Sequence, residues 1–294
     1  MKKLNILIGC LFFRNYTGSE MYVFELSKQL KLLGHSVSII SPNTDGPLVN
    51  DSEILGLKVY NFNSPPKNIK FDIIHSQHQP VIQRLLNLYP NTLMICTIHS
   101  EVIPVEYPII HPNIKKYIAI RPEIKNFIIK NFFPIVDSKV NIIYNPIDNN
   151  RFNKIDCKDD GYVLFVGTID ELRKDTIFNL VDYTKSIGKD FFIVGKNHSN
   201  YLNLLLTNKN VKYFQETKNV EKFVKNCSET SGILLGRTTI EGWLCNKPGW
   251  IYNIDTKGKI LNKQIHQVPN NLENFFSDKV AIQIESEYYK ILSK

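Results

Sequence analysis

The order of apolar and polar segments at the start of the chain constrains its fold more than any other feature. A continuous apolar run at residues 4 to 8 is followed by apolar residues at helical spacing from Glu20 to Leu33. Gly34 ends that helix, and a second apolar run covers Ser36 to Ile40. A strand, a helix and a strand in this order predict a βαβ unit, which implies a parallel sheet covered by helices.

The same alternation continues along the chain and predicts two sheets separated by a linker. Residues 145 to 161 are rich in turn formers and poor in apolar residues, so we interpret them as the linker. Ligands of open α/β sheets bind at the carboxyl ends of the strands, so a cleft between the two halves is the expected site. Further strands are expected at 57 to 61, 71 to 75, 93 to 98, 116 to 120, 140 to 143, 162 to 166, 190 to 194, 211 to 214, 231 to 235 and 249 to 253, with helices at 79 to 88, 122 to 132, 174 to 187, 219 to 227, 239 to 246 and within 272 to 292.

The length of the chain also favours two domains, because 294 residues is long for one core. We predict a first domain at residues 1–150, a second at 151–275, and a C-terminal helix at 276–294 that could pack back on the first domain. With 43% hydrophobic and 22% charged residues, the composition indicates a soluble globular protein. The net charge of +8 favours phosphates, anionic lipid head groups or nucleic acid as partners, although most basic residues are spread over solvated faces.

Cysteine usage and the absence of long apolar runs suggest where the protein works. The five cysteines are far apart and show no CxxC spacing, so neither a zinc site nor a disulfide framework is expected. The apolar region before Cys10 is only about half the minimum for a signal peptide and contains Asn5, so it is better interpreted as a buried strand. No run approaches the roughly 18 apolar residues of a membrane span. We therefore expect a cytoplasmic protein, with attachment to the inner face of a membrane left open.

The candidate ligand site with the clearest local signal is the segment from Gly236 to Gly242. An apolar run at 231 to 235 leads into a glycine-led turn with two threonines, and a helix follows. A helix start of this kind presents free N–H groups and the positive end of the helix dipole to an anion such as phosphate. Glu241 lies in the first turns of that helix, where it could reach a sugar hydroxyl. A dinucleotide site is disfavoured, because the first turn lacks GxGxxG and the second strand ends without an acidic residue.

Several segments along the chain carry a family resemblance when they are taken together. They are Thr17-Gly18-Ser19-Glu20, Gly34-His35-Ser36-Val37, Asp72-Ile73-Ile74-His75-Ser76-Gln77-His78, Thr97-Ile98-His99-Ser100, Asn145-Pro146-Ile147-Asp148-Asn149-Asn150-Arg151-Phe152, Phe165-Val166-Gly167 with Arg173 and Lys174, and the segment from Gly236 to Gly242. In this order they resemble the glycosyltransferase 4 family. The resemblance implies the α/β fold called GT-B, in which two Rossmann-like, doubly wound parallel-sheet domains face a central cleft.

The resemblance implies a hexosyltransferase-type enzyme that works with retention of configuration, without a metal and without a cofactor. Its donor would be a nucleotide sugar, UDP-sugar or GDP-sugar, and its acceptor a glycan or a lipid-linked sugar, as in polysaccharide biosynthesis. Two positions depart from the family pattern, since Thr168 replaces an arginine and Ile233 replaces the first of two glutamates. The implied catalytic residues are His99, Arg173 and Lys174, and the implied donor-binding residues are Gly18, Ser19, Gly167, Arg173, Lys174, Gly236, Arg237, Thr238, Thr239 and Glu241.

Alternatives remain at this stage for residues and for function. Glu241 could merely complement the helix dipole, an effect of about 0.3 to 1 kcal/mol. Lys174 could be a solvated lysine, and His99 could be a hydrogen-bonded core histidine. The chain could transfer sugars to nucleic-acid bases, although nucleic acid is the less favoured partner, or bind sugar nucleotides or glycans without turnover. A sugar-nucleotide epimerase would share the two-domain plan.

Overall fold

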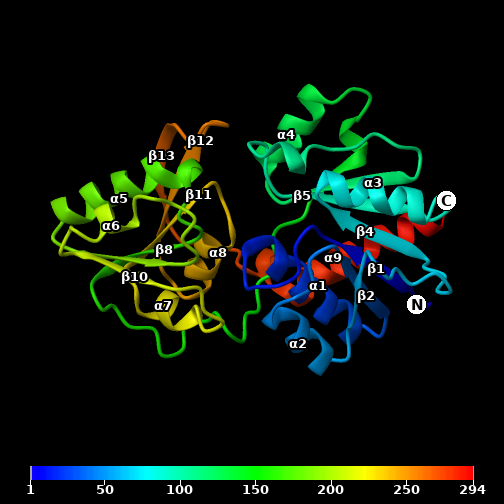
Figure 1. Cartoon of the computed structure of the whole chain (residues 1–294), viewed down its shortest axis with the longest axis horizontal. Coiled ribbons are helices and arrows are strands. Elements are labelled where there is room, and N and C mark those ends of the chain that lie inside the picture. Colours follow the sequence, from blue (N-terminus) through cyan, green and yellow to red (C-terminus); the bar gives the residue numbers. More distant parts are fainter. Residues whose placement is uncertain (1, 294) are drawn as a thin grey trace. The chain divides into compact units, whose positions relative to one another are not determined.

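The computed structural model describes residues 2–293, which form two compact α/β units (Figure 1). Unit 1 contains the chain up to Pro146 and rejoins it at Asn274, and unit 2 spans Ile147–Glu273. The chain therefore leaves unit 1, builds unit 2 and returns to unit 1 with its last helix.

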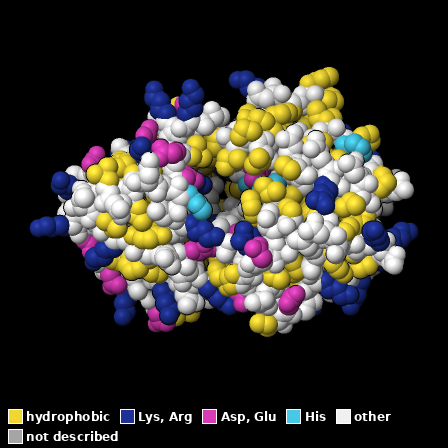
Figure 2. Space-filling model, in the orientation of Figure 1, with side chains coloured by type: hydrophobic (Ala, Val, Ile, Leu, Met, Phe, Trp, Pro, Cys, Tyr) yellow, Lys and Arg dark blue, Asp and Glu magenta, His cyan; other side chains and the backbone are white. Residues whose placement is uncertain are grey.

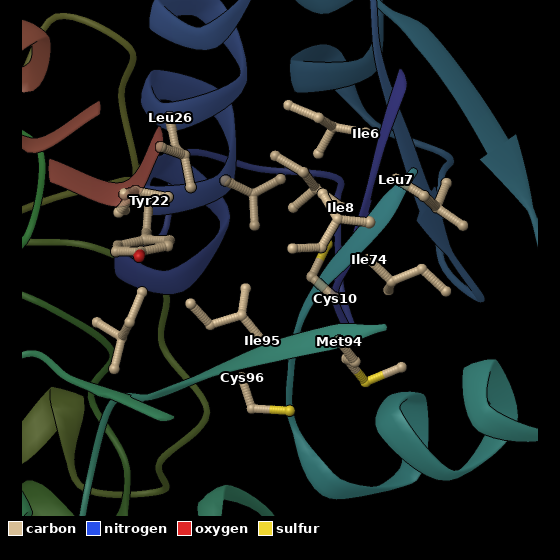
Figure 3. Close-up of a cluster of buried hydrophobic side chains, with 14 of the residues drawn as sticks. Ile6, Leu7, Ile8, Cys10, Tyr22, Leu26, Ile74, Met94, Ile95 and Cys96 are labelled. Atoms are coloured by element: carbon tan, nitrogen blue, oxygen red, sulfur yellow. The ribbon is translucent and has the colours of Figure 1, made fainter. Parts of the chain in front are cut away.

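A parallel sheet of seven strands is the centre of unit 1 among the described residues, in the order β3-β2-β1-β4-β5-β6-β7. Its central strands are fully buried, because helices cover both faces and leave no side of the sheet in water. Figure 3 shows part of the resulting core: Ile6 and Ile8 lie on the side of the sheet where α1 (Gly18–Leu32) packs, and Leu7 and Ile74 lie on the opposite side. The strands are β1 (Asn5–Gly9), β2 (Ser36–Ser41), β3 (Lys58–Asn61), β4 (Ile73–Gln77), β5 (Met94–Ile98), β6 (Ile114–Ala119) and β7 (Val140–Ile142).

Five α-helices cover this sheet in the part of the chain that is described. The last of them packs against α1, and a hydrogen bond of 3.0 Å from Gln29 Nε2 to Ser277 Oγ ties the two together. In Figure 1 this last helix is red and α1 is blue. The helices are α1 (Gly18–Leu32), α2 (Pro47–Ile54), α3 (Gln79–Leu88), α4 (Pro122–Asn131) and α9 (Ser277–Leu292).

Unit 2 repeats the same plan with six described strands in the order β10-β9-β8-β11-β12-β13. All neighbours are parallel except β13, which returns antiparallel to β12 at the edge. The strands are β8 (Tyr162–Val166), β9 (Asp190–Val194), β10 (Val211–Phe214), β11 (Glu229–Ile233), β12 (Gly249–Ile254) and β13 (Ile260–His266), and the helices are α5 (Lys174–Ser186), α6 (Leu202–Leu205), α7 (Glu221–Asn226) and α8 (Arg237–Leu244).

Two doubly wound sheets confirm the predicted α/β class, and the structure corrects several elements. β11 begins at Glu229, two residues before the expected strand, because Glu229 already pairs with Val163 of β8, and its buried carboxylate accepts hydrogen bonds from Tyr183 and Trp250. Helix α8 begins at Arg237 instead of 239, so both threonines lie inside its first turn. The helices α2 and α6 and the strand β13 were not expected from the sequence.

Both sheets have a switch point where the winding direction reverses. In unit 1 it lies between β1 and β4, and in unit 2 between β8 and β11. Connections that follow these strands leave in opposite directions, and ligands of open α/β sheets bind at the carboxyl ends of such strands. The candidate site residues should therefore lie just after β1, β4, β8 and β11.

Candidate functional site

The loop between β1 and α1 is held by the buried carboxylate of Glu20. One oxygen accepts hydrogen bonds from the main-chain N–H groups of Arg14, at 2.8 Å, and Asn15, at 3.2 Å. The other oxygen accepts from the hydroxyl of Thr17. Gly18 follows as the first residue of α1, and a Cβ added there would meet only open space. The loop thus places a side-chain-free position at a helix N-terminus.

His75 lies in β4 and is enclosed within unit 1. Its Nδ1 is 2.6 Å from the hydroxyl of Tyr288 in α9, and its Nε2 is 2.6 Å from the hydroxyl of Thr97 in β5. The Thr97 hydroxyl is in turn 3.0 Å from that of Tyr22. Burial lowers the pKa of His75 to about 3, so its ring is neutral at pH 7. His75 is therefore part of a buried polar chain and does not reach the surface.

His78 follows β4 directly and is fixed through both ring nitrogens. The main-chain N–H of Leu11 donates to Nδ1 at 3.2 Å, and Nε2 lies 3.2 Å from a carboxylate oxygen of Glu106. Because Nδ1 accepts, the proton of the neutral ring lies on Nε2 and points at Glu106. Burial raises the pKa of the Glu106 carboxyl, but the His78 hydrogen bond and the nearby His99 outweigh it, and that pKa falls below its usual value.

His99 follows β5 and is half-buried. Its main-chain N–H donates to Glu106 at 3.2 Å, and its Nε2 lies 2.5 Å from the side-chain oxygen of Gln77. The ring of Tyr22 meets it edge-on, with centroids 4.9 Å apart. Burial, only partly offset by Glu106, lowers the pKa of His99 to about 4, so the ring is neutral at pH 7.

In unit 2, Gly167 directly follows β8, and Arg173 lies beside it. A Cβ added at Gly167 would stand 4.0 Å from Nε of Arg173, whose guanidinium forms an ion pair with Asp170. The next residue, Lys174, turns elsewhere: its Nζ lies 5.5 Å from the centroid of the Tyr201 ring. Of the two basic residues, Arg173 is the one at the carboxyl end of β8.

Helix α8 begins after β11 with Gly236 as its N-cap. No side chain caps the helix, and a Cβ on Gly236 would meet only open space. The first turn of an α-helix leaves N–H groups without acceptors inside the helix, so the start of α8 can receive an anion. One turn further along, Nη2 of the buried Arg237 lies 3.1 Å from Oε1 of the buried Glu241.

The two threonines of this turn differ in their placement. Thr238 is half-buried, and its hydroxyl donates to the carbonyl oxygen of Val166 at 3.4 Å, which ties α8 to the end of β8. Thr239 is buried, and its methyl group packs against Gly249 in β12. The main-chain N–H of Thr239 could therefore serve a ligand, but its side chain faces the sheet.

Comparison with known families and structures gives this arrangement a context. Residues 16–151 match the family model described as Glycosyltransferase Family 4. A glycosyltransferase from Rickettsia africae has a similar structure, with a TM-score of 0.73, 17% identity and 99% of each chain covered. The chain has the GT-B fold, and its residues 16–151 match glycosyltransferase family 4.

Two further structures share the GT-B fold with this chain. HepE of Anabaena, in complex with UDP-glucose, has a TM-score of 0.72 and 13% identity over 99% of each chain. The pneumococcal O-GlcNAc transferase GtfA, in complex with UDP and GlcNAc, has a TM-score of 0.68 and 8% identity over 100% of each chain. At these identities the likeness establishes the fold. No curated protein matches this chain in sequence.

Two further findings on the described residues concern metals and membranes. Residues 2–293 contain no group of three or more His, Cys, Asp or Glu side chains that could hold a metal ion. None of the helices in the same range combines the length and apolar character needed to span a bilayer. Figure 2 shows Lys and Arg side chains dispersed over the surface among acidic and apolar ones.

The residues predicted from the sequence gather at the carboxyl edges of the two sheets. In unit 1 these are Gly18, Ser19 and His99; in unit 2 they are Gly167 and Arg173 after β8 and the segment from Gly236 to Glu241 after β11. Sequence reasoning did not single out Gln77 and Glu106, which bind His99 from positions 22 and 7 residues away. Gln77 lies between His75 and His78 in the sequence, and this position is the feature that could have marked it as a site residue.

Proposed function

We propose that this protein is a glycosyltransferase that moves a hexosyl group from a UDP-sugar or GDP-sugar to a hydroxyl of a glycan or lipid-linked acceptor. We further propose that the reaction retains the anomeric configuration and needs no metal. Among the solved structures with this fold, HepE was obtained with UDP-glucose and GtfA with UDP and GlcNAc, which supports a nucleotide-sugar donor. The placement at the cytoplasmic face of a membrane is also a proposal, and it rests on the lipid-linked acceptor.

The observation that carries the proposal is the start of α8 at the switch point of unit 2. Gly236 leaves space beside the first N–H groups of the helix, which have no acceptor within it, and the buried Arg237–Glu241 pair holds a carboxylate one turn away. The N–H groups would bind the diphosphate, and Glu241 would accept hydrogen bonds from the ribose hydroxyls. Arg173, beside Gly167, would add positive charge where the leaving diphosphate becomes more negative. Lys174 has a smaller part, because Tyr201 and Glu171 hold its ammonium group.

In unit 1, His99 is the residue proposed to contact the reacting sugars. It is neutral at pH 7, half-buried and next to the loop that begins α1. The main-chain groups of Gly18 and Ser19 would lie along the donor, because no side chain at Gly18 obstructs them.

The first experiment is thermal stabilisation by UDP, GDP, ADP, CMP and their sugars. A ligand that binds only the folded state raises the melting temperature by mass action. We expect one nucleotide family to stabilise the wild type but not Glu241→Gln, which keeps a hydrogen-bonding side chain beside Arg237. Asp182→Ala, an exposed acid on α5, is the matched control. If no nucleotide stabilises the wild type, or if Glu241→Gln binds equally well, the donor-site assignment fails.

A competing function is binding of a sugar nucleotide without transfer. It is favoured by Ile233 and Thr168, which stand where the family pattern has a glutamate and an arginine. Turnover decides between the two functions: release of nucleotide with a new glycosidic bond supports transfer, and tight binding without release supports the competitor. Product analysis by NMR gives the anomeric configuration, and activity in excess EDTA tests the metal-independent mechanism.

A further inference from the structure

Gln77, the last residue of β4, connects the start of α1 to His99. Its side chain is buried, and Nε2 donates to the carbonyl oxygen of Ser19 at 3.1 Å. Its Oε1 lies 2.5 Å from Nε2 of His99. A carbonyl oxygen only accepts hydrogen bonds, so the amide NH₂ must face Ser19 and the amide oxygen must face His99.

This orientation determines where the proton of His99 lies. The amide oxygen of Gln77 can only accept, so the hydrogen bond requires a proton on Nε2 of His99. A neutral imidazole has one N–H, and Nδ1 therefore carries a lone pair. Within residues 2–293 no hydrogen bond to this Nδ1 is formed, and a ligand can take that place.

The other charged or titratable groups around His99 leave its ring nitrogens free. Glu106 binds the main-chain N–H of His99, and Arg121 donates to its carbonyl oxygen at 3.4 Å. The ring of His78 stacks on that of His99 with centroids 6.1 Å apart, but both of its nitrogens are engaged by Leu11 and Glu106. Gln77 is thus the described side chain that contacts a ring nitrogen of His99.

We propose that Gln77 is a positioning residue that holds His99 in the Nε2–H tautomer, so that Nδ1 accepts a hydrogen bond from a hydroxyl of the bound sugar. The proposal rests on the proposed glycosyl transfer. Because the side-chain amide of Gln77 also donates to Ser19, it fixes the distance between His99 and the first turn of α1. In the other tautomer, with the proton on Nδ1, the ring would donate a hydrogen bond to that hydroxyl. Its Nε2 could then no longer donate a hydrogen bond to the side-chain oxygen of Gln77.

The test combines ¹⁵N NMR of the histidine rings with kinetics. The two ring nitrogens have different shifts in each tautomer, and His99→Asn assigns the signals. We expect the wild type to show the Nε2–H tautomer and Gln77→Leu to populate the Nδ1–H tautomer. In Gln77→Leu, kcat should fall by at least about tenfold, while the KM for the donor changes less, because binding by unit 2 is untouched. Gln83→Leu, an exposed glutamine on α3, is the control.

A second variant keeps the proposal testable if Gln77→Leu does not fold. In Gln77→Glu the carboxylate still accepts from Nε2 of His99 but repels the carbonyl of Ser19. We expect it to keep the tautomer, to raise the pKa of His99 and to move the acidic limb of the pH–rate profile upward.

The outcomes separate this inference from the proposed function. An Nδ1–H tautomer in the wild type, or an unchanged tautomer in Gln77→Leu, overturns the inference without any activity measurement. A changed tautomer with unchanged kcat overturns the role of Nδ1 in the reaction. Absence of transfer by the wild type contradicts the proposed function, and the NMR measurement still decides the tautomer.

Discussion

His78 and Leu234 occupy equivalent positions in the two units, and both have left-handed backbone conformations, with φ of +67° and +58°. Each directly follows the strand beyond the switch point, β4 or β11, and precedes the next helix. A non-glycine residue there costs about 1–2 kcal/mol. His78 is held by Leu11 and Glu106, and the N–H of Leu234 donates to Tyr252 at 2.8 Å. Strain that recurs at one position in both units is typical of a functional edge.

Replacing Gly195 by alanine should damage the donor side of unit 2. An added Cβ would collide with the main chain of Gly167, so the loop after β8 must move. We expect a loss of stability of about 2–4 kcal/mol and weaker nucleotide binding.

Gly188→Ala is the matched control, because Gly188 also has a positive φ but nothing lies near its Cβ position. It should cost only about 1 kcal/mol, the price of a left-handed alanine, and leave nucleotide affinity unchanged. Chemical denaturation and nucleotide titration of both variants measure the two effects. Equal nucleotide affinities in the two variants would contradict the role of Gly167.

Replacing Glu20 by glutamine should loosen the loop before α1. The carboxylate accepts three hydrogen bonds, and a neutral amide is a weaker acceptor and carries its own donor. We expect the amide protons of Arg14 and Asn15 to exchange at least about tenfold faster, as for a loss of 1–2 kcal/mol. Hydrogen exchange followed by NMR measures this directly, with the exposed Glu53→Gln on α2 as control. Unchanged exchange at both amides would show that Glu20 does not hold the loop.

The buried Arg237–Glu241 pair can be separated into structural and binding roles. Removing only the carboxylate, in Glu241→Leu, should destabilise unit 2 by about 3 kcal/mol because Arg237 stays buried. Adding Arg237→Met should recover most of that loss, since apolar pairs of similar volume replace buried ion pairs well. Neither variant should regain nucleotide affinity. Unfolding can be followed by the fluorescence of Trp243 and Trp250, which both lie in unit 2. Nucleotide binding by the double variant would contradict our assignment of Glu241 to the donor site.

The stability of unit 1 should decrease with acid between about pH 6.5 and pH 4. Burial lowers the pKa of His75 to about 3 and that of His99 to about 4. In this window the unfolded chain binds protons that the folded state does not, so the free energy of unfolding falls as the pH falls. The expected slope is about 1 kcal/mol per pH unit for each histidine, and the full stability is present above pH 6.5.

Hydrogen exchange at the amides of β4 and β5 is the suitable measurement, because the tryptophans report only on unit 2. His75→Gln should reduce the slope, and His198→Gln, at an exposed position, should not. A slope that His75→Gln leaves unchanged would show that another group causes the acid sensitivity.

The sequence predicted the elements with strong apolar patterns, which are continuous runs in buried strands and helical spacing in helices with one buried face. The strand expected at 190 to 194 coincides with β9, and the helix expected at 79 to 88 coincides with α3. The elements missed are those with weak patterns. Strand β13 is exposed along most of its length and has no apolar face that would mark it.

By itself the sequence determined the two-sheet α/β architecture and the turns that carry glycine at helix starts, such as those at Gly18 and Gly236. These follow from local periodicity and from the preference for small turn-forming residues where helices begin. Only the tertiary structure decided which polar groups meet: Gln77 with Ser19 and His99, Glu106 with His78, and Asp170 with Arg173 beside Gly167. Most of these partners are far apart in the sequence and come together because parallel strands end at the same edge of a sheet. No local sequence pattern predicts these contacts, because they depend on burial and hydrogen-bond geometry that exist only in the folded chain.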